Sequence, residues 1–133
     1  MARRHLAIFL KGVAEEILSG KKQVEIRLSQ NRILPYGRIF KDDEILLKNA
    51  GGRIIGKAKV DNCLYYEGLT PELVKDIRQK YHSTAGMAES FWLKKTKARF
   101  ATIIFLKNPQ KFLAPIHYQK HDRRPWVVIK ENL

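Results

Sequence analysis

The segment at residues 20–28 constrains the fold most, because it places a helix end directly before a strand. Apolar and polar side chains alternate from residue 23 onward. The apolar positions are Val24, Ile26 and Leu28, and the polar positions are Gln23, Glu25 and Arg27. This period of two predicts a strand with one buried face. Gly20 suits the left-handed position that ends a helix, so we expect a helix to finish just before the strand begins.

The charged residues of this segment form the candidate site. Glu25 and Arg27 share one face of the expected strand, with Cα atoms about 7 Å apart, so their side chains can pair or bind one ligand together. Lys22 precedes them out of phase with the alternation, and Lys21 adds a further positive charge. Two interpretations stay open. Either these residues line an open pocket, or Glu25 neutralises Lys22 or Arg27 in a buried ion pair.

The spacing Gly-x-Lys-x-x-Glu-x-Arg at residues 20–27 resembles the signature of ASCH domains, which are small barrels similar to PUA domains. The expected order of elements resembles that family too. It begins with a strand at residues 5–10 and a helix at 13–19, and after the motif a glycine-rich turn leads into a strand at 51–58. Helices and a closing β segment follow. The resemblance covers most of the chain and implies a PUA-like fold.

Turn residues and apolar runs divide the rest of the chain. They predict a polar loop at 29–44, strands at 45–48, 53–60 (continuing toward 64–66), 101–106 and 126–129, and helices at 70–81 and 85–95. Thr70 is a good N-cap for the first of these helices, whose expected buried stripe is Leu73, Val74, Ile77 and Tyr81. Strands outnumber helices and lie at both ends of the chain, so we expect an α+β fold in which a mixed sheet of about five to six strands closes into a barrel with two to three flanking helices. The resemblance implies that this barrel is PUA-like.

Length and cysteine content limit the architecture. A chain of 133 residues suits a single ASCH/PUA-like domain over residues 1–133. The single Cys63 can form neither an internal disulfide nor a zinc site, and the four histidines lack metal spacing, so no metal or cofactor is expected. The apolar run ending at Lys11 is too short for a secretory or membrane-spanning segment. We expect a reduced, cytoplasmic setting without membrane contact.

Positive charge is the second strong signal. The chain has 26 Lys and Arg against 13 Asp and Glu, a formal net charge of +13. The cations of residues 94–133 are Lys94, Lys95, Lys97, Arg99, Lys107, Lys111, Lys120, Arg123, Arg124 and Lys130, against Asp122 and Glu131. This excess predicts a polyanionic partner, RNA or another nucleic acid. The alternative is a highly charged soluble surface, although such surfaces usually mix both signs.

Aromatic residues beside cations give further candidate contacts. Trp126 follows Arg123 and Arg124 closely, and a ring beside arginines is typical of single-stranded nucleic acid recognition. The competing interpretation makes Trp126 a core residue. Tyr36 and Arg38 lie in the long loop, where they either contact a ligand or close a turn.

Two classes of function stay open. In the first, the protein is an RNA-binding module in which an unpaired base or nucleotide enters a cleft beside the motif and the C-terminal cations follow the RNA backbone. The candidate contacts are Lys21, Lys22, Glu25, Arg27, Tyr36, Arg38, Arg123, Arg124 and Trp126.

In the second, the resemblance implies a hydrolase, because ASCH-like proteins include hydrolases of acylated cytidines and members reported as ribonucleases. Lys22, Glu25 and Arg27 would then be catalytic. The deacylating subset resembles Gly-x-Lys-Thr-x-Thr-x-Arg, and here Gln23 and Glu25 replace both threonines. This difference removes the hydroxyl nucleophile and argues against deacylation by that route. The substrate, the presence of catalysis and the oligomeric state stay open.

Overall fold

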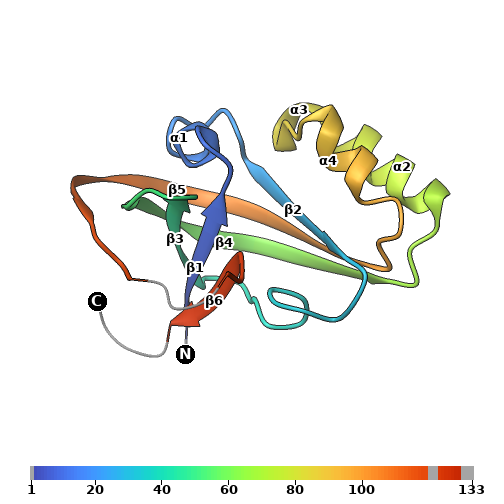
Figure 1. Cartoon of the computed structure of the whole chain (residues 1–133), viewed down its shortest axis with the longest axis horizontal. Helices are drawn as coiled ribbons and strands as arrows, with labels where there is room; N and C mark the ends of the chain where they lie inside the picture. Colours follow the sequence, from blue (N-terminus) through green and yellow to red (C-terminus); the bar gives the residue numbers. More distant parts are fainter. Residues whose placement is uncertain (1, 120–122, 130–133) are drawn as a thin grey trace.

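The structure, a computed structural model, describes residues 2–119 and 123–129. These residues form a six-stranded sheet in the order β2-β5-β4-β3-β1-β6, which curls into a half-barrel flanked by helices (Figure 1). The strands are β1 (Arg4–Phe9), β2 (Val24–Ser29), β3 (Glu44–Asn49), β4 (Ile54–Glu67), β5 (Phe100–Ile116) and β6 (Trp126–Ile129). The helices are α1 (Val13–Leu18), α2 (Pro71–Lys80), α3 (His82–Ala85) and α4 (Glu89–Lys94). The expected α+β fold with a mixed sheet of five to six strands is confirmed. The sheet forms a half-barrel, and the described residues include four helices where two to three were expected.

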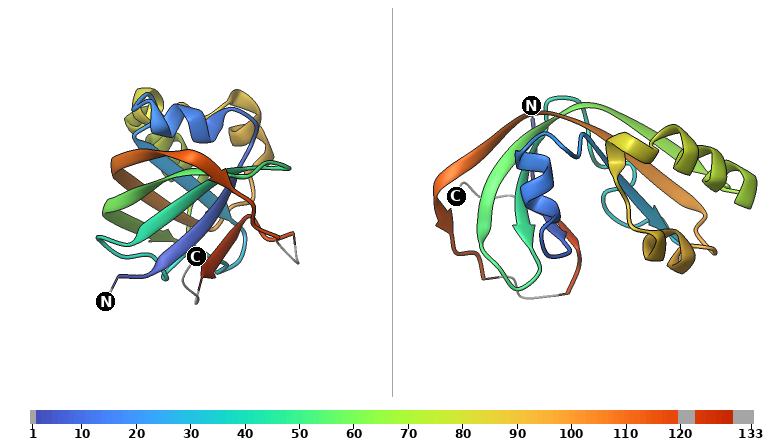
Figure 2. Two further views of the ribbon diagram at one scale, coloured as in Figure 1. Left: turned by 90° about the vertical axis from the view of Figure 1, so that its left-hand side faces the viewer. Right: turned by 90° about the horizontal axis from the view of Figure 1, so that it is seen from above.

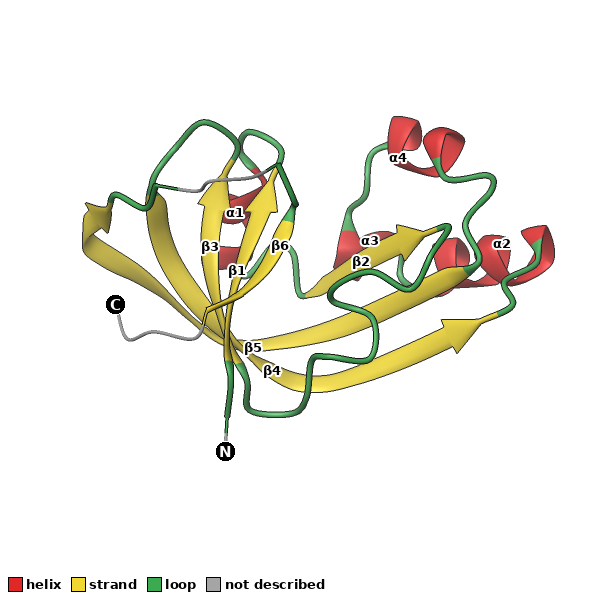
Figure 3. Cartoon of the chain, turned by 60° about the horizontal axis from the view of Figure 1, so that its bottom comes forward, coloured by secondary structure: helices red, strands yellow, loops and turns green. Residues whose placement is uncertain are grey.

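The long antiparallel ribbon of β4 and β5 runs from one half of the molecule to the other (Figure 3). It contributes to the two larger of the three apolar cores of the described residues. One core lies under α1 and includes residues of β1, β3 and Trp126, whereas the other lies under α2, α3 and α4 and includes the apolar face of β2. Figure 2 shows α1 over the curled end of the sheet and the other helices at the opposite end. Ile103 and Ile104 are neighbours on β5, and each packs into a different core, as the alternation of a strand requires.

β5 extends ten residues beyond the expected end at residue 106 and finishes at Ile116. The extension is mostly exposed and pairs with β4 through shifts of register, so it lacks the apolar run that marks a buried strand. Gly56 permits this pairing beneath α1. A Cβ atom at Gly56 would lie 2.6 Å from both the Gln110 carbonyl oxygen and a methyl carbon of Leu18.

The helical region differs from the expectation in two details. Thr70 caps α2 as expected, since its Oγ1 accepts a hydrogen bond from the Leu73 amide at 3.2 Å. The prediction that Leu73 is buried is wrong: its side chain is 37% exposed, while Ile77 is buried. The helix expected at 85–95 is shorter than predicted, because α4 spans only Glu89–Lys94. The separate helix α3 precedes it and ends at Gly86, which adopts a left-handed conformation (φ +58).

A buried polar chain joins β6, β1 and the loop before β3. The Trp126 Nε1–H donates to His5 Nδ1 at 3.0 Å, and His5 Nε2 lies 2.8 Å from Asp43 Oδ2. The first bond makes Nδ1 an acceptor, so the His5 proton is on Nε2 and is donated to Asp43. Burial lowers the pKa of His5, which favours this neutral form. Trp126 is only 1% exposed, so it is a core residue, and the interpretation of its ring as a stacking platform is corrected.

Candidate functional site

A cleft of about 450 Å³ lies between the two halves of the molecule. The end of β1 and the start of α1 form one side, and β2 with the α3–α4 connection forms the other. The apolar part of the lining includes Phe9, Ile26, Met87 and Phe91, and the charged part includes Lys22, Glu25 and Arg27. The motif therefore contributes its charged side chains to an otherwise largely apolar cleft.

Glu25 joins the two cations of the motif. Its Oε1 lies 3.1 Å from Lys22 Nζ, and its Oε2 accepts a hydrogen bond from Arg27 Nε at 2.9 Å. Lys22 and Glu25 are each only 4% exposed. Removing these charges from water costs free energy. Each charge is tolerated here because an opposite charge lies next to it. The ion-pair interpretation and the pocket-lining interpretation are both correct, since the buried network forms part of the cleft lining.

Lys22 has one weak hydrogen-bond partner. Its ammonium group donates to the Ala85 carbonyl oxygen and pairs with Glu25, and its third contact is the thioether sulfur of Met87 at 3.0 Å. A thioether is a much weaker acceptor than an oxygen. Glu25 Oε1, for its part, is buried without a well-formed hydrogen bond among the described residues. Both atoms therefore have hydrogen-bonding capacity that a ligand could use.

Arg27 connects the motif strand to the other end of the sheet. Its Nη2 donates to the Ile8 carbonyl oxygen at 3.0 Å, and its Nη1 donates to the Pro125 carbonyl oxygen at 3.4 Å. The guanidinium group also lies 5.1 Å from the ring centres of both Phe9 and Trp126, within the range of a cation–π interaction. These contacts fix the orientation of Arg27 at the cleft.

A second set of cations reaches the cleft from α4. Ser90, Phe91, Lys94 and Lys95 line it, and their spacing places them on one face of the helix. In the sequence, Lys94 and Lys95 stand out only as part of the basic C-terminal region. The Ser90-to-Lys94 spacing was a signal for a shared face, but the sequence did not show which element that face would meet.

The other candidate residues lie elsewhere. Lys21 is exposed, with Nζ 3.5 Å from a carboxylate oxygen of Glu16, and it does not line the cleft. Tyr36 and Arg38 line a different cavity, described below. Arg123 and Arg124 are exposed just before β6. Lys120 and Lys130, counted in the basic region, and His121 lie outside the described residues.

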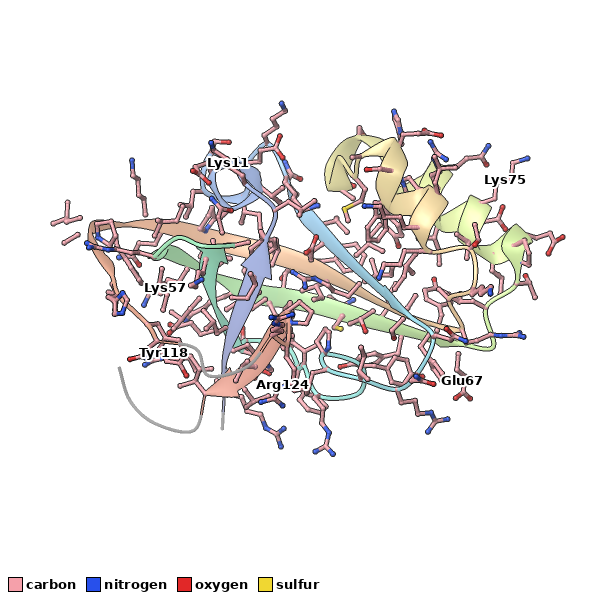
Figure 4. The ribbon with its side chains drawn as sticks, viewed as in Figure 1. Lys11, Lys57, Glu67, Lys75, Tyr118 and Arg124 are labelled. Atoms are coloured by element: carbon pink, nitrogen blue, oxygen red, sulfur yellow. The ribbon has the colours of Figure 1, made fainter. Side chains whose placement is uncertain are left out.

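Cations are distributed over much of the surface. Figure 4 shows Lys11 beside α1, Lys57 on β4, Lys75 on α2 and Arg124 beside β6. The net charge therefore creates a broad positive field, and the cleft needs its own geometry to select a ligand.

The described residues can be compared with the requirements of metal sites, membrane spans and nucleophilic thiols. They contain no group of three His, Cys, Asp or Glu side chains that could hold a metal ion, and none of their helices is long and apolar enough to cross a membrane. Burial raises the pKa of Cys63 to about 11, so its thiol is a poor nucleophile at neutral pH.

Comparison with known proteins identifies the family. The model of the ASCH domain matches residues 10–116. The chain belongs to the ASCH domain family. No curated protein matches the sequence.

Solved structures share the ASCH fold of this chain. An ASCH protein from Zymomonas mobilis is 18% identical, with a TM-score of 0.73 over 97% of this chain and 89% of that chain. The N-terminal domain of Staphylothermus marinus McrB is 13% identical, with a TM-score of 0.53 over 89% of this chain and 78% of that one. A protein from Enterococcus faecalis V583 is 6% identical, with a TM-score of 0.54 over 79% and 77% of the two chains.

Proposed function

We propose that this ASCH protein binds RNA and recognises one unpaired base or nucleotide in the cleft lined by Lys22, Glu25 and Arg27. The observation that carries the proposal is the combination of buried, oriented charges with an apolar cleft of about 450 Å³. Sites for small organic ligands typically measure about 300–1,000 Å³ and place a few fixed polar groups in an apolar lining. A nucleobase, flat and apolar on its faces and polar at its edge, fits this description.

The atoms whose hydrogen-bonding capacity is not filled by the protein suggest how each side chain would contact the base. Lys22 Nζ would exchange its contact with the Met87 sulfur for a carbonyl oxygen of the base. Glu25 Oε1, which lacks a well-formed hydrogen bond, would accept one from an exocyclic amine. Lys94 and Lys95 at the same cleft would meet phosphate oxygens. Phe91, also in the lining, offers an apolar surface against which the base can pack.

The remaining surface cations would supply affinity that does not depend on sequence. With a formal charge of +13, the protein attracts a polyanion from every direction, and each neutralised phosphate releases counterions. Lys21, Arg123 and Arg124 belong to this group in the proposal, since they are exposed and outside the cleft lining. Charge would therefore provide affinity, and the cleft would provide selectivity.

The hydrolase alternative has less support from the geometry. A general base must take a proton from the substrate or its water. Both Glu25 oxygens instead lie beside cations, Oε1 at 3.1 Å from Lys22 Nζ and Oε2 at 2.9 Å from Arg27 Nε. The arrangement is better suited to holding a ligand than to transferring a proton, so binding is the function we propose.

Filling the cleft without changing its charge tests the proposal. Ser90 is an exposed cleft-lining residue on α4, so Ser90→Trp should occupy the space of a base and leave the surface cations in place. Ser83→Trp is the matched control, because Ser83 is also exposed but does not line the cleft. Affinities would be measured for a panel of RNA loops, single strands and duplexes.

We expect Ser90→Trp to reduce discrimination within the panel by about tenfold or more, on the order of one lost base interaction. The affinity for all members at low salt should persist. Unchanged discrimination in a folded Ser90→Trp variant would exclude the cleft as the recognition site. A wild type that binds no RNA at low salt would exclude the whole proposal.

A further inference from the structure

A second cavity, of about 370 Å³, lies next to the motif cleft. It is lined by Arg3, Arg32, Leu34, Tyr36, Arg38 and Val128. Leu34 lines both cavities, so they are neighbours separated by the loop between β2 and β3. The second cavity thus joins a residue near the N terminus, the loop and β6, three segments far apart in the sequence.

All charged residues in this lining are arginines. Arg32 pairs with Glu67 at 2.7 Å, but both side chains are more than 60% exposed, and such surface pairs stabilise little. Arg3 and Arg38 have no ion-pair partner within the described part of the chain. The Arg3 guanidinium lies 5.7 Å from the ring centre of Phe40 instead. The positive charge of the cavity is therefore poorly compensated by the protein.

Guanidinium groups suit phosphate in particular. Each presents a planar fork of N–H donors that can form two parallel hydrogen bonds to phosphate oxygens, which a lysine cannot do. Three guanidinium groups around one cavity repel one another in the absence of an anion, and a bound phosphate would relieve that repulsion. No acidic side chain among the described lining residues would oppose it.

Tyr36 gives the cavity a rigid aromatic surface. Its ring packs edge-on against Tyr65 and Phe100, with centroid distances of 5.2 and 5.1 Å. The loop is fixed nearby, since the Ile39 amide donates to the Tyr65 hydroxyl oxygen at 2.9 Å. A half-buried ring held this way can support a base at a small entropic cost, as aromatic side chains do in proteins that bind single strands.

From these observations we infer that the second cavity is a subsite for the nucleotide adjacent to the one held in the motif cleft. Arg3, Arg32 and Arg38 bind the phosphodiester group, and Tyr36 packs against the neighbouring base. The ligand is single-stranded RNA that passes over Leu34 from one cavity to the other. This inference rests on the proposed function, because it extends the same bound strand by one subsite.

Ligand length provides the test. Binding of a mononucleotide and of a trinucleotide would be measured for the wild type, for the double variant Arg3→Gln with Arg38→Gln, and for a control. The control is Arg53→Gln paired with Lys75→Gln, which removes the same charge from two exposed positions that line neither cavity. Arg38 is exposed and Arg3 contributes to the fold through its backbone amide, so unfolding midpoints should confirm that the double variant folds.

We expect the wild type and the control to bind the trinucleotide at least about tenfold more tightly than the mononucleotide. A gain of this size is typical of one added stacking subsite. The double variant should keep its mononucleotide affinity and lose most of this gain. If the double variant keeps the whole gain in affinity from mononucleotide to trinucleotide, the second subsite is wrong, whereas the proposed role of the motif cleft is unaffected. Failure of the wild type to bind either nucleotide would overturn both proposals.

A pentaglutamate peptide separates nucleotide recognition from simple attraction of anions. It carries more negative charge than the trinucleotide but has neither phosphate nor base. Binding as tight as that of the trinucleotide, with the same loss in the double variant, would overturn the subsite in favour of an acidic protein partner. Weak binding of the peptide that is equal in the double variant and the control would support the nucleotide subsite.

Discussion

Arg27 on β2 donates a hydrogen bond from Nη2 to the carbonyl oxygen of Ile8 on β1 at 3.0 Å. In the sheet order, β2 stands at one end, while β1 stands beside β6 at the other end. The half-barrel is therefore bridged across its open side by an arginine side chain of the motif. Because Arg27 also pairs with Glu25 at 2.9 Å, the ion network of the cleft and the closure of the sheet depend on the same residue.

Arg27→Ala should consequently reduce stability as well as RNA discrimination. Removing one partner of a buried ion pair typically costs about 3–5 kcal/mol, and we expect about 3 kcal/mol because Lys22 still pairs with Glu25. Arg27→Lys keeps the charge but loses the planar guanidinium group, so its loss of stability should lie between zero and that of Arg27→Ala. Urea unfolding would measure both, with Arg53→Ala as the exposed control. A loss below about 0.5 kcal/mol for Arg27→Ala would show that the bridge is not structurally important.

Glu25→Gln separates a binding protein from an enzyme. The substitution keeps the shape of the side chain and removes its charge. A binding protein should therefore keep or slightly increase its general RNA affinity at low salt as negative charge leaves the cleft, whereas its preference for a base that donates to Glu25 should fall. Stability should fall by roughly 2 kcal/mol, because Lys22 and Arg27 lose their shared counter-charge.

The matched control is Glu16→Gln, since Glu16 also lines the cleft but is more exposed. Turnover of RNA and of modified nucleosides would be assayed for the wild type and both variants. A wild-type activity that falls 100-fold or more in Glu25→Gln, as expected for an acid–base residue, and persists in Glu16→Gln would contradict the binding account.

His5 should make stability fall in mild acid. Burial lowers the pKa of His5 in the folded protein, whereas the unfolded chain has an ordinary histidine pKa of about 6.5. Below that pH the unfolded state binds the proton more readily than the folded state, so the free energy of unfolding decreases as pH falls. The slope reaches at most about 1.4 kcal/mol per pH unit.

Urea unfolding at pH 7.5, 6.5 and 5.5 would measure this dependence. His5→Gln should be less stable at pH 7.5 and should lose the His5 part of the slope, whereas His82→Gln, at an exposed position, should keep it. Parallel slopes for the wild type and His5→Gln would refute the assignment of a neutral, buried His5.

Salt should weaken RNA binding steeply. Each neutralised phosphate of a single strand contributes about −0.7 to the slope of log affinity against log salt. Replacing Arg123 and Arg124 together with Ala should weaken all RNA ligands nearly equally and make the slope shallower by up to about 1.4. Titrations at several salt concentrations would show this. An effect confined to one RNA sequence would mean that these arginines read bases.

The sequence predicted features that depend on neighbouring residues. The alternation from residue 23 onward placed the motif strand correctly at Val24–Ser29, because a period of two is local information. Thr70 capped its helix as expected. The glycine at position 20 ends the first helical segment with a positive φ of 83, as its sequence position indicated.

Features that depend on distant contacts were missed or left open. Trp126 is buried in the apolar core and donates a hydrogen bond to His5, which lies 121 positions away, and no local pattern reveals that partner. Lys94 lines the cleft from α4, a separate helix that follows the turn at Gly86. Arg3 meets the loop residue Arg38 only through the curl of the sheet, so the second cavity has no sequence signature.

Methyl NMR of methionine tests the central claim most directly. Met87 contacts Lys22 in the cleft, and the variant Met87→Leu would identify its methyl signal by removing it. Titration with a ribonucleotide of the preferred base should shift the Met87 methyl signal saturably, with the affinity measured by calorimetry. A Met87 signal that stays in place while the protein becomes saturated would show that the base binds elsewhere.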